Sequence, residues 1–146
     1  MIYIGIDPGA KGGIAIINED EVHAYAYSDD ELKRICSDIK EDALCFVEKV
    51  GAMPGQGVVS MFNFGKSYGY ILGVLEANKI PYQLISPHKW KNHFSLTKDK
   101  GASVQLAKRL YPKISLLPTV RCKKESDGMA EALLIALYAK RTNGEV

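Results

Sequence analysis

The chain has 146 residues, of which 47% are hydrophobic and 25% charged, and its formal net charge is +2 at pH 7. This length and composition predict one globular domain, residues 1–146, whose core needs neither disulfide bonds nor a structural metal. No segment reaches the ~18 apolar residues of a membrane helix, and no basic region precedes the first apolar run. The sequence therefore predicts neither a membrane span nor a signal peptide.

Charged side chains are unevenly distributed along the chain. Residues 1–78 carry 6 basic and 12 acidic side chains, whereas residues 79–146 carry 13 basic and 5 acidic ones. A basic half favours contact with a polyanion. On charge alone, however, a solvated basic surface without a partner explains the asymmetry equally well.

The first part of the chain has the pattern of a sheet. Residues 2–6, 12–17 and 21–27 predict three strands, joined by a glycine-rich turn and a polar turn. A helix is expected over residues 29–40, where apolar side chains recur at spacings of three and four. The apolar run at residues 43–47 is typical of a central strand covered on both faces.

The second part predicts mostly helices. A glycine-rich loop is followed by a helix over residues 60–78, a strand at residues 81–85 and a helix capped by Ser86. Further helices are expected over residues 97–110 and from about Ser126 onward. Three hairpin-like strands followed by alternating helices and strands predict an α/β fold, with a mixed five-stranded sheet flanked by helices.

The three cysteines, Cys36, Cys45 and Cys122, are odd in number and lack the CxxC spacing of a zinc site. They predict reduced thiols in an intracellular protein.

Four carboxylates occupy places where a buried charge needs a partner. Asp7 ends the first strand and Glu48 ends the central one, while Asp127 and Glu131 lie one turn apart on the same face of the last helix. A helix N-terminus by itself stabilises an acid such as Asp127. Glu131, in contrast, lies among alanines and leucines, where an unpaired carboxylate is costly. A cation near these acids is therefore expected.

The chemistry of this acidic set favours a particular kind of cation. It offers only oxygen ligands, which suit Mg²⁺ or Mn²⁺ and not zinc. Two such ions about 4 Å apart stabilise both the attacking and the leaving oxygen of a phosphoryl displacement. The acids therefore point to metal-dependent phosphodiester chemistry.

The segments IGIDPGAKGGIAII, CFVEK and SDGMAEALLIALY, in this order, resemble the RuvC-type Holliday-junction resolvases, especially the small phage versions. The resemblance spans essentially the whole chain and implies the ribonuclease H-like fold. It implies that Asp7 bridges two Mg²⁺ ions, for which Mn²⁺ substitutes, and that Glu48 binds one of them. It also implies that Asp127 and Glu131 complete the two sites. The family often spaces its last two acids at i, i+3, whereas here position 128 is glycine and the spacing is i, i+4.

Basic residues after position 88 are the expected contacts to DNA phosphates. In the family, a lysine-bearing segment before the next-to-last helix contacts the scissile region, so Lys98 and Lys100 are the first candidates by resemblance. Lys89 and Lys91 belong to the same cluster, and Lys11 in the first turn is a further candidate. An exposed turn lysine without a role is the alternative for Lys11. Phosphate contacts position a duplex but read no sequence.

The loop VGAMPGQGVVSMFNFG, which follows Glu48, carries apolar side chains next to the acids. Apolar side chains that insert between base steps open bent DNA. The family places such a wedge soon after its strand glutamate, and since the matching position here is Gly51, the candidates are Met53 and Phe62. The alternative is that these side chains cover the core of the protein. Trp90, farther along the chain, is expected to be a packing residue.

Gly65, Gly69 and Gly73 recur every four residues on one ridge of a predicted helix. Each costs about 1 kcal/mol relative to alanine in a helix interior, so we expect another element to approach this ridge closely. That element is either the sheet or the matching helix of a second subunit. Because a resolvase cuts two strands symmetrically, the resemblance implies a two-fold homodimer.

The leading interpretation is a crossover junction endodeoxyribonuclease. It would use two Mg²⁺ ions and no organic cofactor to nick paired strands at four-way DNA junctions during recombination and repair. A non-catalytic module that binds branched DNA, and a nuclease for RNA or forked DNA, are alternatives on the same fold. The nucleotide-binding fold of actin-like ATPases needs two such domains, for which 146 residues are too few. The likeness to phage enzymes implies the cytoplasm of a bacterial host cell.

Overall fold

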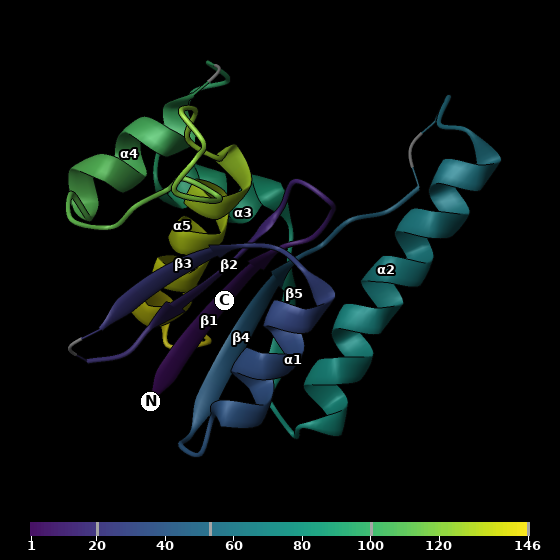
Figure 1. The fold of residues 1–146 in the computed structure, drawn as a ribbon, viewed down its shortest axis with the longest axis horizontal. Helices are drawn as coiled ribbons and strands as arrows, with labels where there is room; N and C mark the ends of the chain where they lie inside the picture. Colours follow the sequence, from purple (N-terminus) through teal and green to yellow (C-terminus); the bar gives the residue numbers. More distant parts are fainter. Residues whose placement is uncertain (20, 53, 100, 146) are drawn as a thin grey trace.

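The computed structural model describes residues 1–145 apart from residues 20, 53 and 100. One five-stranded sheet carries helices on both of its faces (Figure 1). None of the described helices combines the length and the apolar character that crossing a bilayer requires.

The sheet is mixed, as the sequence predicts. Its strand order is β3-β2-β1-β4-β5. The pairs β1–β2 and β2–β3 are antiparallel, whereas β1–β4 and β4–β5 are parallel. The strands are β1 (Ile2–Asp7), β2 (Gly13–Ile17), β3 (Val22–Ala26), β4 (Ala43–Glu48) and β5 (Tyr82–Ile85).

The helices divide between the two faces and form two cores. On one face, α1 and α2 pack against alternate side chains of β1 and β4, among them Ile4 and Val47. On the other face, α5 packs across β1, β2 and β4, with α3 and α4 beside it. The helices are α1 (Asp29–Asp38), α2 (Val58–Ala77), α3 (Pro87–His93), α4 (Ala102–Leu110) and α5 (Asp127–Thr142).

Glycine lets α5 approach the sheet more closely than any side chain would allow. A Cβ atom on Gly13 of β2 would lie 2.6 Å from the carbonyl oxygen of Gly128 at the start of α5. A Cβ atom on Gly5 of β1 would overlap the backbone of Ala132 and Ala136. These contacts fix both the height and the position of α5 over the sheet.

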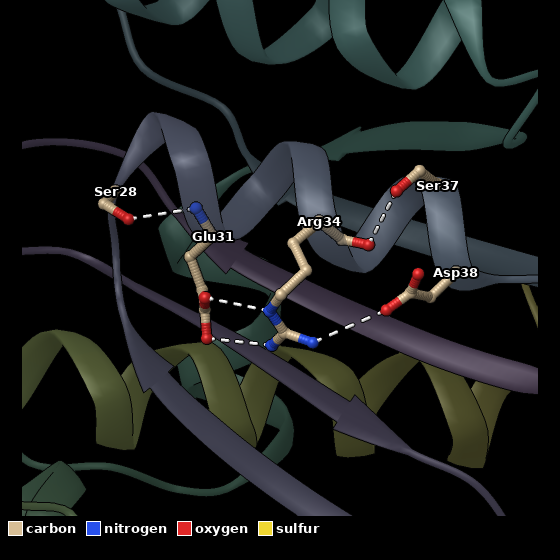
Figure 2. A network of polar contacts seen from close by, with 5 residues as sticks. All are labelled: Ser28, Glu31, Arg34, Ser37 and Asp38. Atoms are coloured by element: carbon tan, nitrogen blue, oxygen red, sulfur yellow. Dashed lines mark hydrogen bonds and ion pairs between the residues drawn. The ribbon is translucent and has the colours of Figure 1, made fainter.

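Helix α1 packs Leu32, Ile35 and Cys36 into the core, and its exposed side carries a network of polar contacts (Figure 2). The Ser28 hydroxyl accepts a hydrogen bond from the Glu31 backbone N–H at 3.0 Å and caps the helix. The Arg34 guanidinium donates two hydrogen bonds to the Glu31 carboxylate and lies 3.6 Å from Asp38. This network is exposed, and its members come from the cap and body of α1 alone.

Most elements begin and end within two residues of the predicted positions, but the helix predicted over residues 97–110 is wrong in its first turn. It begins only at Ala102. Gly101 has a left-handed backbone with φ of 85°, which the interior of a helix does not permit. The Thr97 hydroxyl also accepts a hydrogen bond from the Asp99 backbone N–H at 3.3 Å, which favours a turn.

Candidate metal centre

Asp7 and Glu48 lie together because β1 and β4 are parallel neighbours. The register pairs Ile6 with Val47, so the next residue of each strand is an acid at the same edge of the sheet. Helix α5 crosses this edge with Glu131 facing the strands. One carboxylate oxygen from each of Asp7, Glu48 and Glu131 lies within 4.8 Å of the other two. Three distant segments thus form one acidic cluster, as the sequence predicts.

Burial and mutual repulsion make this cluster unfavourable without a cation. Burial raises the pKa of Asp7 most and the negative charges of Glu131 and Glu48 raise it further, which together bring it to about 8. Burial also raises the pKa of Glu131, although the nearby Lys91 ammonium opposes this shift. Asp7 is therefore mostly protonated at neutral pH unless a cation binds beside it.

The geometry of the cluster fits a hard divalent cation. Oxygen ligands on opposite sides of one Mg²⁺ lie about 4 Å apart, close to the separations in this cluster. Carboxylates are also the ligand type that Mg²⁺ and Mn²⁺ prefer. Asp7, Glu48 and Glu131 would hold such an ion, and its charge would remove the repulsion that raises the pKa of Asp7.

Asp127 lies beside this cluster and outside the group of three. It is the first residue of α5, where the Ser126 side chain caps the helix. Its negative charge contributes to the raised pKa of Glu131, and both side chains line a cavity of about 220 Å³. The role of Asp127 as a ligand of a second ion stays a prediction.

Two of the predicted DNA contacts line the same cavity as these acids. Lys91 on α3 has its Nζ 3.9 Å from Glu131 Oε1, and its side chain is 43% exposed. Lys98, in the loop before α4, lines the cavity as well. Lys91 and Lys98 therefore line the same cavity as Glu131 and Asp127, and their role as DNA contacts stays a prediction.

Two other predicted lysines, Lys11 and Lys89, are not among the residues that line this cavity. Lys11, in the β1–β2 turn, lines a second cavity of about 390 Å³ together with Lys124 and Asp127. Lys89 is exposed on α3. Lys100, like the wedge candidate Met53, lies outside the described residues.

Trp90 has a role that the sequence does not reveal. It is fully buried, as a packing residue should be, but its indole Nε1–H also donates a hydrogen bond to Glu48 Oε2 at 2.8 Å. The expectation that it only packs is therefore incomplete. A usable signal exists in the sequence, since a buried tryptophan needs an acceptor for its N–H, but the sequence alone does not identify that acceptor.

The start of α2 exposes a group of apolar side chains. Val58, Val59 and Phe62 are 84%, 73% and 72% exposed. The alternative that Phe62 covers the core is therefore wrong, and its role as a wedge stays a prediction. Behind it, a largely apolar cavity of about 190 Å³ lies between the loop after β4 and α2, and Tyr68 at its edge donates a hydrogen bond to the Glu48 carbonyl oxygen.

Within the part of the chain that the structure describes, no element packs against the glycine ridge of α2. A Cβ atom on Gly65, Gly69 or Gly73 would meet no atom within 4 Å, and all three positions are exposed. The explanation that the sheet approaches this ridge is therefore wrong. Contact with a second subunit stays a prediction.

Comparison with solved structures identifies the fold. RuvC from Thermus thermophilus in complex with a Holliday junction substrate superposes with a TM-score of 0.66 over 98% of this chain and 94% of that one, at 14% sequence identity. The chain has the RuvC fold. A second structure of Thermus thermophilus RuvC gives a TM-score of 0.60 over 98% of this chain and 97% of that one, also at 14% identity. A comparison of the sequence with protein-family models and with curated proteins finds no match.

Proposed function

We propose that this chain is a divalent-metal-dependent DNA endonuclease that resolves four-way junctions by paired nicks. The observation that supports this most directly is the cluster of Asp7, Glu48 and Glu131 at one edge of a sheet with the RuvC fold. A protein that only bound a polyanion would gain nothing from three carboxylates in its binding surface, because they repel phosphates.

Bound at the cluster, a pair of Mg²⁺ ions would supply an activated water and stabilise the leaving oxygen, giving a 5′-phosphate and a 3′-hydroxyl. The residues of the chain have separate tasks around this chemistry. Asp7, Glu48 and Glu131 hold the cations, with Asp127 next to them for the second one. Lys91 and Lys98 bind the phosphate groups that flank the scissile bond, which makes binding weaken steeply with salt.

The exposed start of α2 supplies the contact to bases. Phe62 lies past the loop that follows Glu48 and presents an aromatic ring to solvent. An aromatic side chain of this kind stacks on unpaired bases or opens a base step at a cost of a few kcal/mol. At a four-way junction, such a contact would hold the bases of the crossover apart.

We also propose that the active form is a two-fold homodimer. A junction has two strands of equal geometry to cut, and a two-fold axis presents two identical sites to them. Helix α2 supports this proposal because its glycine ridge is open and its first turn exposes Val58 and Val59. A second copy of α2 could approach this ridge as closely as backbone contact allows.

Cleavage of defined substrates tests the proposal. The wild-type chain and Asp7→Asn are compared on a four-way junction, a fork, a linear duplex and an RNA–DNA hybrid, each with Mg²⁺ and with chelator. We expect the wild type to cut the junction with Mg²⁺, and Asp7→Asn to bind the junction without cutting it. Asp42→Asn is the matched control, because Asp42 is exposed and precedes β4 at the opposite edge of the sheet.

Three results would contradict the proposal in distinguishable ways. Cutting by Asp7→Asn at the wild-type rate would remove the acidic cluster from the chemistry. Junction binding by the wild type without product in Mg²⁺ or Mn²⁺ would indicate a non-catalytic binding module. Preferred cutting of the fork or of the RNA–DNA hybrid would keep the nuclease and change its substrate.

A further inference from the structure

We propose that Trp90 is a positioning residue for Glu48. Its indole N–H holds one oxygen of the Glu48 carboxylate, which leaves the other oxygen to turn toward Asp7 and Glu131 and bind a cation. This inference rests on the proposed metal centre, but it concerns a residue that contacts no substrate and lies on a different element from every acid of the cluster.

The contact is short and protected from water. Trp90 Nε1 lies 2.8 Å from Glu48 Oε2, Trp90 is 0% exposed, and Glu48 is 9% exposed. An indole N–H can only donate, so Oε2 is the acceptor and its direction is fixed by the ring. A rigid bicyclic side chain packed in the core holds the Glu48 carboxylate in a more fixed position than a solvated lysine would.

The backbone around Trp90 is held by the same strand pair as Glu48. Glu48 is paired with Ile85 in the parallel β4–β5 ladder, and the Lys49 backbone N–H donates to the Ile85 carbonyl oxygen at 2.7 Å. Helix α3 follows directly, capped by Ser86, and places Trp90 one turn later. Backbone and carboxylate of Glu48 are therefore both held by the segment from β5 to α3.

The next residue of α3 extends this arrangement to a second acid. Lys91 Nζ lies 3.9 Å from Glu131 Oε1 and 5.4 Å from the centre of the Trp90 ring. Adjacent residues of one short helix thus contact two of the three carboxylates. The contact of Trp90 with Glu48 is buried, whereas the contact of Lys91 with Glu131 is partly exposed. Water can therefore compete with the Lys91 contact but not with the Trp90 hydrogen bond.

The expected loss of metal affinity can be taken from other proteins in which a hydrogen bond orients a metal ligand. Loss of a hydrogen bond that orients a ligating side chain typically lowers metal affinity 10–100-fold. Trp90→Phe removes the N–H and keeps an aromatic ring in the core. If Trp90 only packs, the same substitution lowers stability and leaves metal affinity unchanged.

Mn²⁺ binding measured by electron paramagnetic resonance separates these two roles. We expect Trp90→Phe to bind Mn²⁺ 10–100-fold more weakly than the wild type, with the far-ultraviolet circular dichroism of a folded protein. Phe94→Leu is the matched control: Phe94 packs against the same core next to α3 but has no hydrogen bond to the acids. We expect Phe94→Leu to lose stability and to keep its Mn²⁺ affinity.

Fluorescence gives a second readout that needs no Trp90 variant. Trp90 is the single tryptophan of the chain, so all indole emission comes from the partner of Glu48. We expect its emission to change saturably on Mg²⁺ addition, and this change to disappear in Glu48→Gln. If Trp90→Phe does not fold, an emission that stays unchanged at saturating Mg²⁺ still counts against the inference.

The inference is overturned if folded Trp90→Phe binds Mn²⁺ as tightly as the wild type, or if saturating Mg²⁺ leaves the indole emission of the wild type unchanged. Failure of the proposed function is different and visible in the same experiment. In that case the wild type itself shows no saturable Mn²⁺ binding, or Asp7→Asn binds Mn²⁺ as well as the wild type does.

Discussion

Replacing Asp7 by asparagine should stabilise the metal-free protein while removing its metal affinity. Burial and the charges of Glu131 and Glu48 raise the pKa of Asp7 from 3.8 to about 8. The folded state therefore binds a proton more firmly than the unfolded state between about pH 4 and pH 8. The free energy of unfolding of the wild type must then fall as pH rises through this window.

The structure sets the size of this effect. Each unit of pKa shift corresponds to about 1.4 kcal/mol, so the full shift is equivalent to about 6 kcal/mol. Solvent reaches this edge of the sheet and screens part of the repulsion, and we therefore expect Asp7→Asn to gain about 1–3 kcal/mol near pH 8. Near pH 4 the protonated acid and the amide have similar polarity, and the difference should vanish.

Urea denaturation with chelator at pH 4.5 and pH 8 measures this gain directly, with Asp42→Asn as the exposed control. Addition of Mg²⁺ at pH 8 should then reverse the order, because only the wild type gains stability from the bound ion. Our reasoning is refuted if Asp7→Asn is less stable than the wild type at pH 8 in chelator, since the acid would then have a stabilising partner within the protein.

Further predictions concern the metal, the packing of α5 and the ridge of α2. Because Asp7 must lose its proton to bind a cation, Mg²⁺ affinity should rise about tenfold per pH unit up to about pH 8. Calorimetric titration with Mg²⁺ at pH 6.5 and pH 7.5 tests this prediction, and equal affinities at the two pH values would contradict it. Gly13→Ala should cost about 1–3 kcal/mol of unfolding free energy, because the added Cβ overlaps the start of α5, whereas Gly57→Ala meets no atom and should be tolerated. Gly69→Ala should raise monomer stability by about 1 kcal/mol and weaken the homodimer in analytical ultracentrifugation; an unaffected dimer would place the interface elsewhere.

The acids of the candidate site could be predicted because each is anomalous in its own local pattern. Asp7 and Glu48 end apolar strands, and Glu131 interrupts an apolar helix, so burial was foreseeable for each one separately. That the three meet follows from the parallel pairing of β1 with β4 and from the crossing of α5 over their ends. The order of elements predicts only a mixed sheet flanked by helices, and the meeting of the acids was implied by the resemblance to the RuvC-type resolvases.

The parts that could not be predicted depend on contacts between distant residues or on single backbone angles. The Trp90 hydrogen bond joins residues 42 positions apart, and nothing local to either residue identifies the other. The late start of α4 depends on the left-handed backbone of Gly101, which competes with an otherwise helical pattern. The open glycine ridge is visible in the sequence, but only the structure excludes the sheet as its partner.

The acidic cluster differs from an ordinary buried ion pair in how little positive charge surrounds it. Among the described residues, the single ion pair of the three acids is that of Glu131 with Lys91, at 3.9 Å and with a lysine that is 43% exposed. A structural ion pair would be stabilised by close, bidentate partners, as Arg34 provides for Glu31 on the surface of α1. Among the residues that the structure describes, Asp7 has no such partner, and the hydrogen-bond donor to the Glu48 carboxylate is the neutral indole of Trp90. The fold therefore holds the three carboxylates together by packing and gives them little positive charge, so that a bound divalent cation would relieve the repulsion between them.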